Sequence, residues 1–545
     1  MVKVDRRIGL LFTAFLLLLV LAGTRAIWLV GVQGSSLRSK AAAQQVQILH
    51  VPARRGTITD RNGVELAVSE DSATVFANPH LVHDPGAAAS RIAPVIGRPV
   101  PEVLRALTQS GRGFVYLARQ IDTSRGDAVR KLKIPGVDVT TEPRRHYPHG
   151  ELASQLVGAV GTDGYGLAGI EQSRERKLHG ADGRRRVVSD AIGQPVSIVD
   201  VKPSTPGHDI RLTIDSAIQE RAEAVLHSVG QTYQPKGATA MVLNPRNGEI
   251  LALANWPPVD AQHFGDAPAY ARQDRAVGAS YEPGSTFKAI TVSGALEERL
   301  ATPGTVFSVP PSLRVSDRVI HDAEGHGYES LTVARILAQS SNVGTDEIGL
   351  RLGRDNFDKW VRRFGFGRAT GVEIPGEAAG IVPRPSQYSG SSMGNLPIGQ
   401  GLAVTPVQMA AAYEAIADGG IAHQPHVIAG DSARGRRVVD ADTARKVARM
   451  LEGVLGPGGT APEAQIPGYI LAGKTGTAQK PEPGGYSSTR FVASFIGFAP
   501  ARDPRLLVAV MVDEPQGSIY GGMVAAPAFQ KIASFALPYL RIPPG

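Results

Sequence analysis

One long apolar segment near the N-terminus limits how the rest of the chain can fold. Residues 8–32 are apolar or small almost throughout, and Arg25 is the one charged residue among them. The short segment before the run is basic, with Lys3, Arg6 and Arg7. Such a run can span a bilayer with its basic flank inside, so we predict a cytoplasmic tail at 1–7 and an uncleaved transmembrane anchor at 8–32. The alternative is a cleaved signal peptide, for which the run is long and lacks a clear cleavage site.

The remaining chain has no second apolar run of that length, so we expect it to form folded domains outside the cytoplasm. A stretch rich in proline and glycine at 203–207 indicates a linker. We therefore predict an elongated α+β pedestal domain at 33–205 and a second α+β domain at 206–545. In the second domain, strands near both ends and helices between them predict an antiparallel sheet flanked by helices.

Hydrophobic patterning places the individual elements. In the first domain we expect a helix at 37–50, a hairpin turn at Asn62-Gly63, short helices within 85–135 and strands within 184–203. In the second domain we expect strands at 209–214, 238–243, 249–254, 468–480, 491–499 and 505–513. Its helices are expected at 216–229 (capped by Asp215), 285–298, 330–366, 404–418 and 527–539.

Composition excludes several kinds of site. The chain has no cysteine, which rules out disulfides, thiolate nucleophiles and cysteine-ligated zinc. A net charge of +8 and a pI near 9.6 suit a protein that works beside an anionic membrane or wall polymer. The basic residues occur in short groups with little aromatic interleaving, so we do not predict nucleic-acid binding.

The first candidate for chemistry is the stretch YEPGSTFK at 281–288. Pro283 and Gly284 break the preceding structure, and the helical spacing that follows places Ser285 and Lys288 on one face. A serine hydroxyl becomes a nucleophile when a base takes its proton, and burial with a nearby cation can lower the pKa of a lysine enough for that task. By itself the pair is better explained as a helix N-cap beside a solvated cation.

Two further motifs change that balance. SSN at 340–342 ends an apolar helical pattern, and KTGT at 474–477 ends a predicted strand. The set S-x-x-K, S-x-N and K-T-G is that of penicillin-binding proteins and class A β-lactamases. With it the chain resembles the class B penicillin-binding proteins, most closely the septal, FtsI-type D,D-transpeptidases. The resemblance covers nearly the whole chain, with pedestal motifs at 55–61, 145–150 and 169–171 and septal-branch motifs at 395–402 and 520–527.

The resemblance implies a penicillin-binding, β-lactamase-like serine-transpeptidase domain and a role for each motif residue. The catalytic residues would be Ser285 as nucleophile, Lys288 as its base, Ser340 as proton relay, Asn342 as partner of the substrate amide and Lys474 as a cation. Lys474 would lower the pKa of Lys288 and attract the substrate carboxylate. The substrate-binding residues would be Thr475, Gly476 and Thr477. Backbone N–H groups of Ser285 and Thr477 would form the oxyanion hole.

The implied function is a membrane-anchored D,D-transpeptidase that cross-links peptidoglycan stem peptides ending in D-Ala-D-Ala, in septal wall synthesis, and that β-lactams acylate. It implies a single-pass protein of the bacterial cytoplasmic membrane whose catalytic domain is extracytoplasmic, with no cofactor and no metal. Residues 33–205 offer no carboxylate constellation for a glycosyltransferase. A SEDS-type, FtsW-like membrane glycosyltransferase and other divisome proteins are therefore the expected partners.

Three alternative functions stay open at this point. A side-wall elongation transpeptidase would share every catalytic motif. A D,D-carboxypeptidase or a β-lactamase would hydrolyse the acyl-enzyme, but we find no equivalent of the extra glutamate that class A lactamases use. A non-catalytic scaffold would have no need of the intact serine and lysine motifs.

Other candidate sites fit less well. His321 and His326 flank acidic residues without the spacing of a helical metal pair. The glycines of 161–169 and 399–401 lack the strand and downstream acid of a dinucleotide site. We interpret the pair Asp513-Glu514 as solvated loop charges.

Overall fold

The computed structural model describes residues 2–31, 46–109, 113–189, 195–430 and 435–544. Their contacts separate two compact units. The first contains Met1–Arg54, Asp71–Pro143 and His179–Gly207, and the second contains Arg55–Glu70, Arg144–Leu178 and His208–Gly545. The domain boundaries given above from the sequence stay a prediction.

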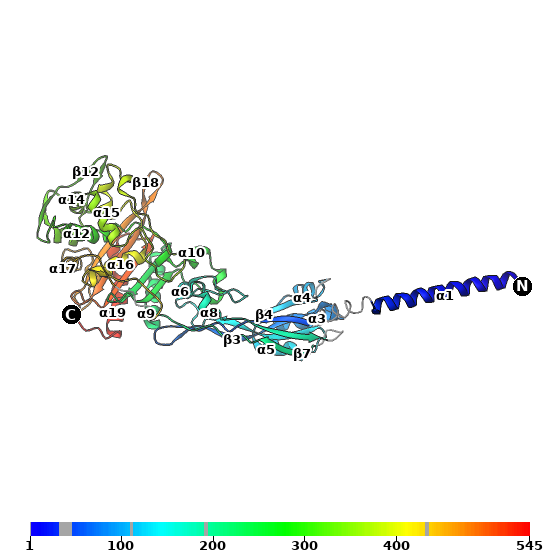
Figure 1. Cartoon of the computed structure of the whole chain (residues 1–545). Coiled ribbons are helices and arrows are strands. Elements are labelled where there is room, and N and C mark those ends of the chain that lie inside the picture. The colour runs from blue at the N-terminus through cyan, green and yellow to red at the C-terminus, as the bar shows by residue number, and fades with distance from the viewer. Residues whose placement is uncertain (1, 32–45, 110–112, 190–194, 431–434, 545) are drawn as a thin grey trace. The chain divides into compact units, whose positions relative to one another are not determined.

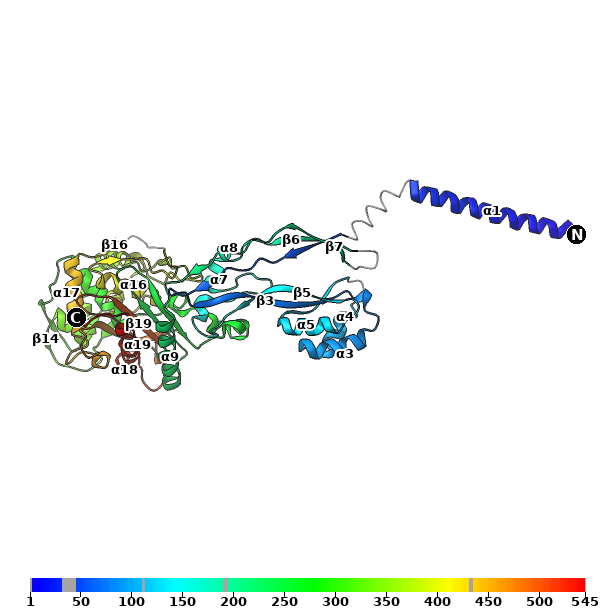
Figure 2. The same cartoon turned by 90° about the horizontal axis from the view of Figure 1, so that it is seen from below.

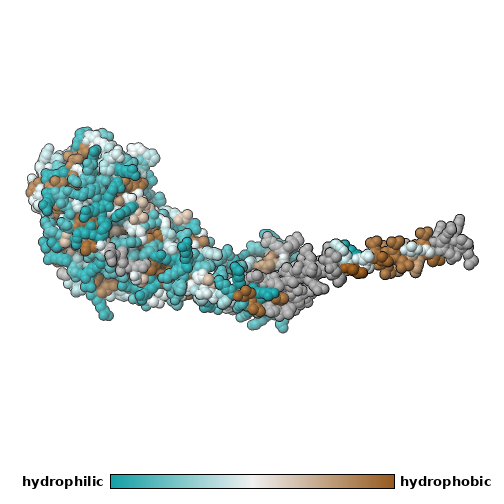
Figure 3. All heavy atoms as spheres, viewed as in Figure 1, coloured by the Kyte–Doolittle hydropathy of each residue, from teal (hydrophilic) through white to brown (hydrophobic). Residues whose placement is uncertain are grey.

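Helix α1 (Val2–Gly31) contains the apolar run. Its segment Ile8–Leu29 has a mean hydropathy of 2.2, and within the described residues no other helix is long and apolar enough to cross a membrane. Most of the exposed side chains between residues 8 and 28 are apolar (Figure 3). The hydroxyls of Thr13 and Thr24 donate to carbonyl oxygens four residues earlier, at 2.8 and 2.9 Å. These polar groups are therefore satisfied within the helix, as an apolar surrounding requires.

The first unit contains a three-stranded antiparallel sheet with β6 in the middle. Its strands are β1 (Val46–Val51), β6 (Gly183–Ser189) and β7 (Pro195–Lys202), seen together in Figure 2. The helix predicted at 37–50 was wrong over 46–50, which form β1, and its residues 37–45 lie outside the described residues. The β-branched residues of β1 favour an extended backbone, and pairing with β6 fixes it.

In the first unit, helix α3 (Pro85–Ile96) packs on α4 (Val100–Leu107) and α5 (Thr123–Lys131), and α4 packs on strand β4 (Val115–Ile121) (Figure 1). Their buried core includes Ile92, Val103, Leu107, Val115 and Val129. The side chain of Asp84 accepts a hydrogen bond from the backbone of Ala87 and so caps α3. The prediction of short helices in this region was confirmed, but the strand β4 was missed.

The second unit begins with the predicted turn. Strands β2 (Ile58–Thr59) and β3 (Glu65–Ala77) pair antiparallel on either side of Asn62-Gly63, which confirms the hairpin. Gly63 has φ +92°, a conformation that glycine adopts without strain. The predicted strand at 209–214 is reduced to β8 (Ile210–Arg211), which pairs parallel with β2.

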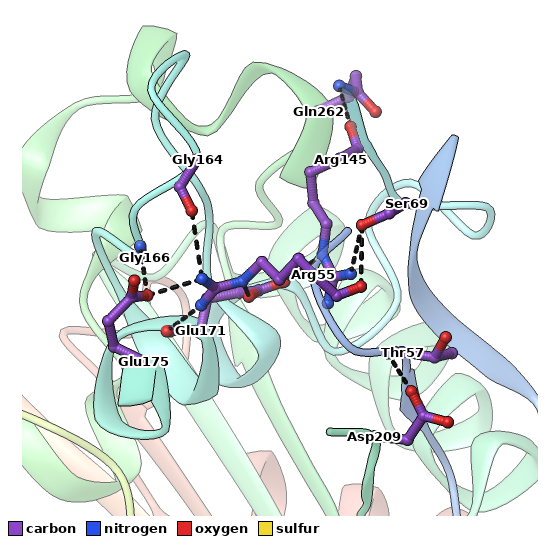
Figure 4. Close-up of polar contacts among 10 residues, drawn as sticks. All are labelled: Arg55, Thr57, Ser69, Arg145, Gly164, Gly166, Glu171, Glu175, Asp209 and Gln262. Atoms are coloured by element: carbon purple, nitrogen blue, oxygen red, sulfur yellow. Dashed lines mark hydrogen bonds and ion pairs between the residues drawn. The ribbon is translucent and has the colours of Figure 1, made fainter. Parts of the chain in front are cut away.

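A buried ion-pair cluster fixes these N-terminal segments within the second unit (Figure 4). Glu171, which is fully buried on α7 (Gly169–Ser173), accepts hydrogen bonds from the guanidinium groups of Arg55 and Arg145. Arg55 also pairs with Glu175 at 2.7 Å, at the start of α8 (Glu175–Leu178). Arg145 lies in β5 (Val137–His146). The three pedestal motifs, which are far apart in the sequence, thus meet at the carboxylate of Glu171.

A five-stranded antiparallel sheet forms the centre of the second unit. In spatial order the strands are β10 (Ile250–Trp256), β9 (Gly237–Leu243), β19 (Leu506–Asp513), β18 (Gly485–Ala499) and β17 (Ala472–Glu482). The predicted antiparallel sheet, completed by both ends of this part of the chain, was confirmed. β17 is an edge strand, so one of its edges is open to other groups.

Helices cover both faces of this sheet. α9 (Ser216–Tyr233) and α19 (Ala526–Tyr539) pack together against it, and α16 (Pro406–Ala417) packs on β9, β18 and β19. Every residue of β9 is buried, as expected for a strand covered on both sides. Asp215 caps α9, as predicted.

The second unit contains further short helices and strands (Figure 1). They are α6 (Ser154–Val157), α10 (Ala269–Arg272), α11 (Arg275–Gly278), α12 (Lys288–Glu297), β11 (Val306–Val309), β12 (Leu313–Val315), β13 (Arg318–Ile320), β14 (Glu329–Thr332), α13 (Val333–Gln339), α14 (Asn342–Leu352), α15 (Arg354–Arg363), β15 (Ile421–Ala422), β16 (Arg436–Arg437), α17 (Ala441–Glu452) and α18 (Gly521–Val524). Those from α12 to α15 surround the SSN segment. The pattern at 441–452 was not predicted as a helix.

Candidate active site

The predicted nucleophile lies on a tight turn ahead of a buried helix. Residues Gly284–Phe287 form a 3₁₀ turn, and α12 begins at Lys288, so the predicted helix at 285–298 starts with a tighter turn. Gly284 has φ +54°, and its N–H donates to the carbonyl of Gly399 at 3.0 Å. Tyr413 donates to the carbonyl of Thr286 at 2.7 Å from a buried position on α16. These contacts hold the half-buried Ser285 in place.

The turn packs directly on strand β17. A Cβ built on Gly476 would lie 3.0 Å from the carbonyl oxygen of Pro283 and from a methyl carbon of Thr286. A Cβ built on Gly284 would lie 3.1 Å from the Cβ of Ala478. Both glycines therefore permit a close approach that larger residues would prevent. This contact brings the nucleophile turn beside the KTGT segment.

Lys288 is fully buried, and its amine is held by the SSN motif. Nζ donates to the Ser340 carbonyl oxygen at 2.5 Å and to Asn342 Oδ1 at 2.7 Å, and it lies 3.3 Å from Ser340 Oγ. Burial lowers the pKa of Lys288 to about 8, against the opposing influence of Asp322 and Asp346. A substantial fraction of this amine is therefore neutral near physiological pH, as a base must be.

Ser340 has a backbone conformation that directs its carbonyl group at Lys288. It ends α13 with φ +63°, a left-handed conformation that costs a serine on the order of 1 kcal/mol. Ser341 then caps α14 by accepting from the N–H of Gly344 at 2.9 Å. Backbone strain that brings a carbonyl oxygen to a buried amine is typical of functional sites.

Asp322, in the loop after β13, holds the SSN turn and was missed by the sequence analysis. Its carboxylate accepts from Ser341 Oγ at 2.7 Å, from the N–H of Val343 at 2.9 Å, and from the N–H of Asn342. His326 lies 3.0 Å from the same carboxylate. A single acid in an irregular loop has no periodic signal, so only tertiary contact identifies it. Among the described residues no group of acidic and histidine side chains is arranged to hold a metal ion.

Lys474 is a second fully buried lysine. Its Nζ lies 3.2 Å from the carbonyl oxygen of Thr475. Burial, and then the charge of Lys288, hold the pKa of Lys474 well below its usual value. We expected Lys474 to lower the pKa of Lys288, but in this structure burial is the cause that lowers it.

The two threonines of the KTGT segment have different surroundings. Thr475 Oγ1 lies 2.7 Å from Thr460 Oγ1, a neighbour that the sequence did not indicate. Thr477 Oγ1 accepts from the N–H of Gly521 at 3.1 Å. Gly521 and Gly399 belong to the two septal-branch motifs, and each contacts the site: Gly521 at Thr477 and Gly399 at Gly284.

The structure thus assembles most of the predicted site, with one exception. Lys288, Ser340 and Asn342 share hydrogen bonds, Lys288 and Lys474 influence each other electrostatically, and the turn of Ser285 packs on the strand of Thr477. Within the described part of the chain, Ser285 Oγ makes no hydrogen bond to Lys288. Catalytic hydrogen bonds often tighten only when substrate binds, so this geometry is compatible with proton transfer in a complex.

Two family models match the chain. The penicillin binding protein transpeptidase domain matches residues 238–534, and the penicillin-binding protein dimerisation domain matches residues 50–212. Together these matches include the nucleophile turn, the SSN and KTGT motifs and the ion-pair cluster.

Curated relatives match over nearly the full length. "Probable peptidoglycan D,D-transpeptidase PenA" of Neisseria meningitidis is 34% identical, over 99% of this chain and 93% of the relative. "Peptidoglycan D,D-transpeptidase FtsI" of Escherichia coli is 32% identical, over 99% and 92%. Among solved structures, penicillin binding protein 3 of Mycobacterium tuberculosis in complex with aztreonam has a TM-score of 0.72 and 31% identity, over 91% of this chain and 98% of that chain.

Proposed function

This chain belongs to the class B penicillin-binding proteins of the FtsI type, and from that membership we propose how its residues catalyse the reaction and where the protein works. It is a peptidoglycan D,D-transpeptidase, and it binds peptidoglycan substrates and β-lactams. The observation that supports the proposed mechanism most directly is the buried amine of Lys288, held by Ser340 and Asn342 immediately after the turn of Ser285.

In the proposed acylation step, neutral Lys288 takes the proton of Ser285 as Oγ attacks the carbonyl carbon of the penultimate D-Ala. Backbone N–H groups of Ser285 and Thr477 donate to the oxyanion of the tetrahedral intermediate. The bond to the terminal D-Ala nitrogen then breaks, and the proton on Lys288 passes through Ser340 to that leaving amine. The products are an ester on Ser285, free D-Ala and neutral Lys288.

In the second step an amine from another stem peptide attacks the ester carbonyl. Its proton returns along the same path to Lys288 and then to Ser285 Oγ as the ester bond breaks. The new amide is the cross-link, and the enzyme regains its starting protonation state. Asn342 is proposed to bind the donor amide, because its side chain offers both a donor and an acceptor.

Lys474, with Thr475 and Thr477, is proposed to bind the terminal carboxylate. A bound carboxylate would favour the charged form of Lys474, whose pKa burial holds well below its usual value. That cation would in turn oppose protonation of the neighbouring Lys288. Substrate binding would thus help to keep the catalytic amine neutral at the moment it is needed.

Labelled penicillin on the detergent-solubilised chain separates the enzyme classes. A single adduct on Ser285 that persists for hours is expected for a transpeptidase. Rapid release of penicilloate would indicate a β-lactamase, and rapid release of D-Ala from a stem peptide without cross-linked product would indicate a carboxypeptidase. An intact chain that forms no adduct at all would contradict the proposed mechanism.

We place the catalytic unit outside the cytoplasm, anchored by α1 as a single-pass segment of the bacterial cytoplasmic membrane. The motivation is the apolar run Ile8–Leu29 after a basic flank, together with the FtsI-type relatives. Cysteines introduced at Tyr328, which is 79% exposed, should react in whole cells with a membrane-impermeant maleimide. A cysteine at Val2 should not react, and the opposite pattern would contradict the orientation.

A septal role with a SEDS-type, FtsW-like polymerase and other divisome proteins is proposed from the FtsI-type relatives. The exposed turn at 61–64 is a candidate contact. Arg55 is unsuitable for testing it because its reversal would break the buried ion pair with Glu171. Arg61→Glu should instead weaken copurification with the polymerase, while Arg246→Glu, a partly exposed control, should not. Equal copurification of both variants would contradict this partner surface, and lateral rather than midcell localisation would favour an elongation role.

A further inference from the structure

A buried acid that the proposed mechanism does not use lies beside the catalytic lysine. Asp346 is on α14, one helical turn after Asn342, and therefore on the helix face that carries the contact with Lys288. α14 packs against α12, the helix of Lys288 (Figure 1). Asp346 is fully buried, and neither of its carboxyl oxygens has a hydrogen-bond partner among the described residues.

The surroundings of Asp346 make its charged form costly. The charged groups that act on it are Lys288 of α12, Arg318 of β13 and Asp322 of the following loop. Strand β11 and the turns at 392–394 and 396–398, which also pack on α14, carry no titratable side chain. The ionisable residues of α13 and α15 are mostly exposed, at Arg335, Arg354, Asp355, Lys359 and Arg363. Burial raises the pKa of Asp346 to about 8, because desolvation outweighs the attraction of the two cations.

Two other acids, Asp322 and Glu414, differ from Asp346 in their surroundings. Asp322 lies close by, but Ser341, Asn342 and Val343 donate to its oxygens, so its carboxylate is satisfied. Glu414 is also a buried acid, but the backbone of His423 favours its charged form through a hydrogen bond, and among the described residues no cation lowers the pKa of its carboxyl. Asp346 alone of these three combines unpaired oxygens with the electrostatic influence of Lys288.

The charges of Lys288 and Asp346 act on one another, so the protonation of one group depends on that of the other. Removal of one proton from the fully protonated pair gives either a neutral acid beside a neutral amine, or a carboxylate beside an ammonium ion. Only the first of these can accept the proton of Ser285. The two forms have the same total charge, so they compete at every pH.

We propose that Asp346 is a positioning residue that controls the protonation of Lys288: the protonated acid permits the neutral, reactive amine, and the ionised acid retains the proton on it. The proposal rests on the proposed role of Lys288 as the base. It gives the enzyme an acylation rate that rises with pH more gradually than one isolated lysine would produce. Asp346 touches no substrate and acts through Lys288 alone.

The test is the pH dependence of acylation in Asp346→Asn. The amide keeps the size of the acid but cannot ionise, so the competing ammonium form is lost. The acylation rate constant for a fluorescent penicillin should reach half its maximum at a pH lower by roughly one unit, with a severalfold higher rate at pH 7. Glu347→Gln on the same helix and Glu414→Gln, a buried acid without a cation, should keep the wild-type profile.

Three outcomes overturn the proposal. An unchanged profile in Asp346→Asn would mean that the acid does not influence Lys288. A shift to higher pH would mean that the acid promotes the neutral amine. Loss of acylation at every pH in a folded variant, without rescue in Asp346→Glu, would mean that the acid itself accepts the proton.

If Asp346→Asn does not fold, Asp346→Ser should show the same downward shift. Wild-type protein that forms no Ser285 adduct at any pH would instead contradict the proposed function.

Discussion

Lys288 Nζ donates a hydrogen bond to Asn342 Oδ1 at 2.7 Å, within a site where the lysine side chain is completely buried. The contact joins the S-x-x-K motif to the S-x-N motif through one neutral acceptor. An amide oxygen can hold an amine without fixing a proton on it, which a carboxylate would do. The choice of asparagine at this position therefore bears directly on the pKa of Lys288.

Asn342→Asp should convert this contact into an ion pair. A carboxylate at that distance typically raises the pKa of an amine by about 1–3 units, so the neutral fraction of Lys288 at pH 7 should fall about tenfold or more. Acylation by penicillin should fall by the same factor at pH 7 and recover at higher pH. Asn356→Asp, on the neighbouring helix α15, is the control. Equal losses at pH 7 and pH 10 would contradict this explanation.

Lys474→Met should separate function from stability. Lys474 is fully buried, and none of the described carboxylates pairs with it, so an apolar side chain of similar length should leave the free energy of unfolding equal or higher. Acylation by penicillin should nevertheless fall roughly 100-fold, because the carboxylate of the ligand loses its cation. Denaturant unfolding and acylation kinetics on the same preparation measure both effects. A variant that is unstable yet fully reactive would contradict the assignment.

Glu171→Gln should strongly destabilise the second unit. The substitution leaves Arg55 and Arg145 buried without their shared anion, a loss that typically costs about 3–5 kcal/mol. Asp71→Asn breaks the exposed pair with Arg54 and should cost less than about 1 kcal/mol. The two variants are compared by the urea concentration at which each loses half of its penicillin binding. Similar urea midpoints for the two variants would show that burial of the cluster contributes little.

Asp274 predicts a pH dependence of stability. Burial raises the pKa of Asp274 to about 7, above the unfolded value of 3.8. The folded chain keeps a proton that the unfolded chain loses, so this group's contribution to stability is fully present below about pH 4 and is lost as pH rises toward 7. Asp274→Asn cannot ionise and retains an acceptor for Asn255 and Ala276.

The free energy of unfolding of Asp274→Asn, relative to wild type, should therefore increase by a few kcal/mol between pH 4 and pH 8. Asp84→Asn removes the charge of an exposed helix cap and should show no such trend. Unfolding monitored at several pH values gives both curves. A relative stability of Asp274→Asn that is independent of pH would contradict a buried, protonated Asp274.

Much of the fold could be predicted because its signals are local. The hairpin at Asn62-Gly63, the cap at Asp215 and the five strands of the central sheet follow from turn chemistry and apolar patterning. The segment 46–50 was misassigned because its short apolar pattern suits a helix as well as a strand. Its partner β6 lies more than a hundred residues later, and pairing decided the outcome.

The candidate site, like the fold, could be predicted from the sequence only in part. Ser285, Ser340 and Lys474 belong to motifs that can be recognised in the sequence. Those motifs do not indicate which atoms accept hydrogen bonds from Lys288, or why its pKa is low. Asp322 and Asp346 were invisible because each is a lone acid whose importance comes from its neighbours in space. The ion-pair cluster of Glu171 was suggested only as separate motifs, and its contacts explain why they occur together.

The most direct test of the account compares wild-type chain with Lys288→Arg by acylation of Ser285 across pH 6 to 10. We predict a wild-type rate that rises with an inflection near pH 8, the pKa of the buried amine, and no Ser285 adduct in the variant, because a guanidinium stays charged throughout this range. A folded Lys288→Arg variant that acylates at the wild-type rate with the same pH dependence would show that another group activates Ser285.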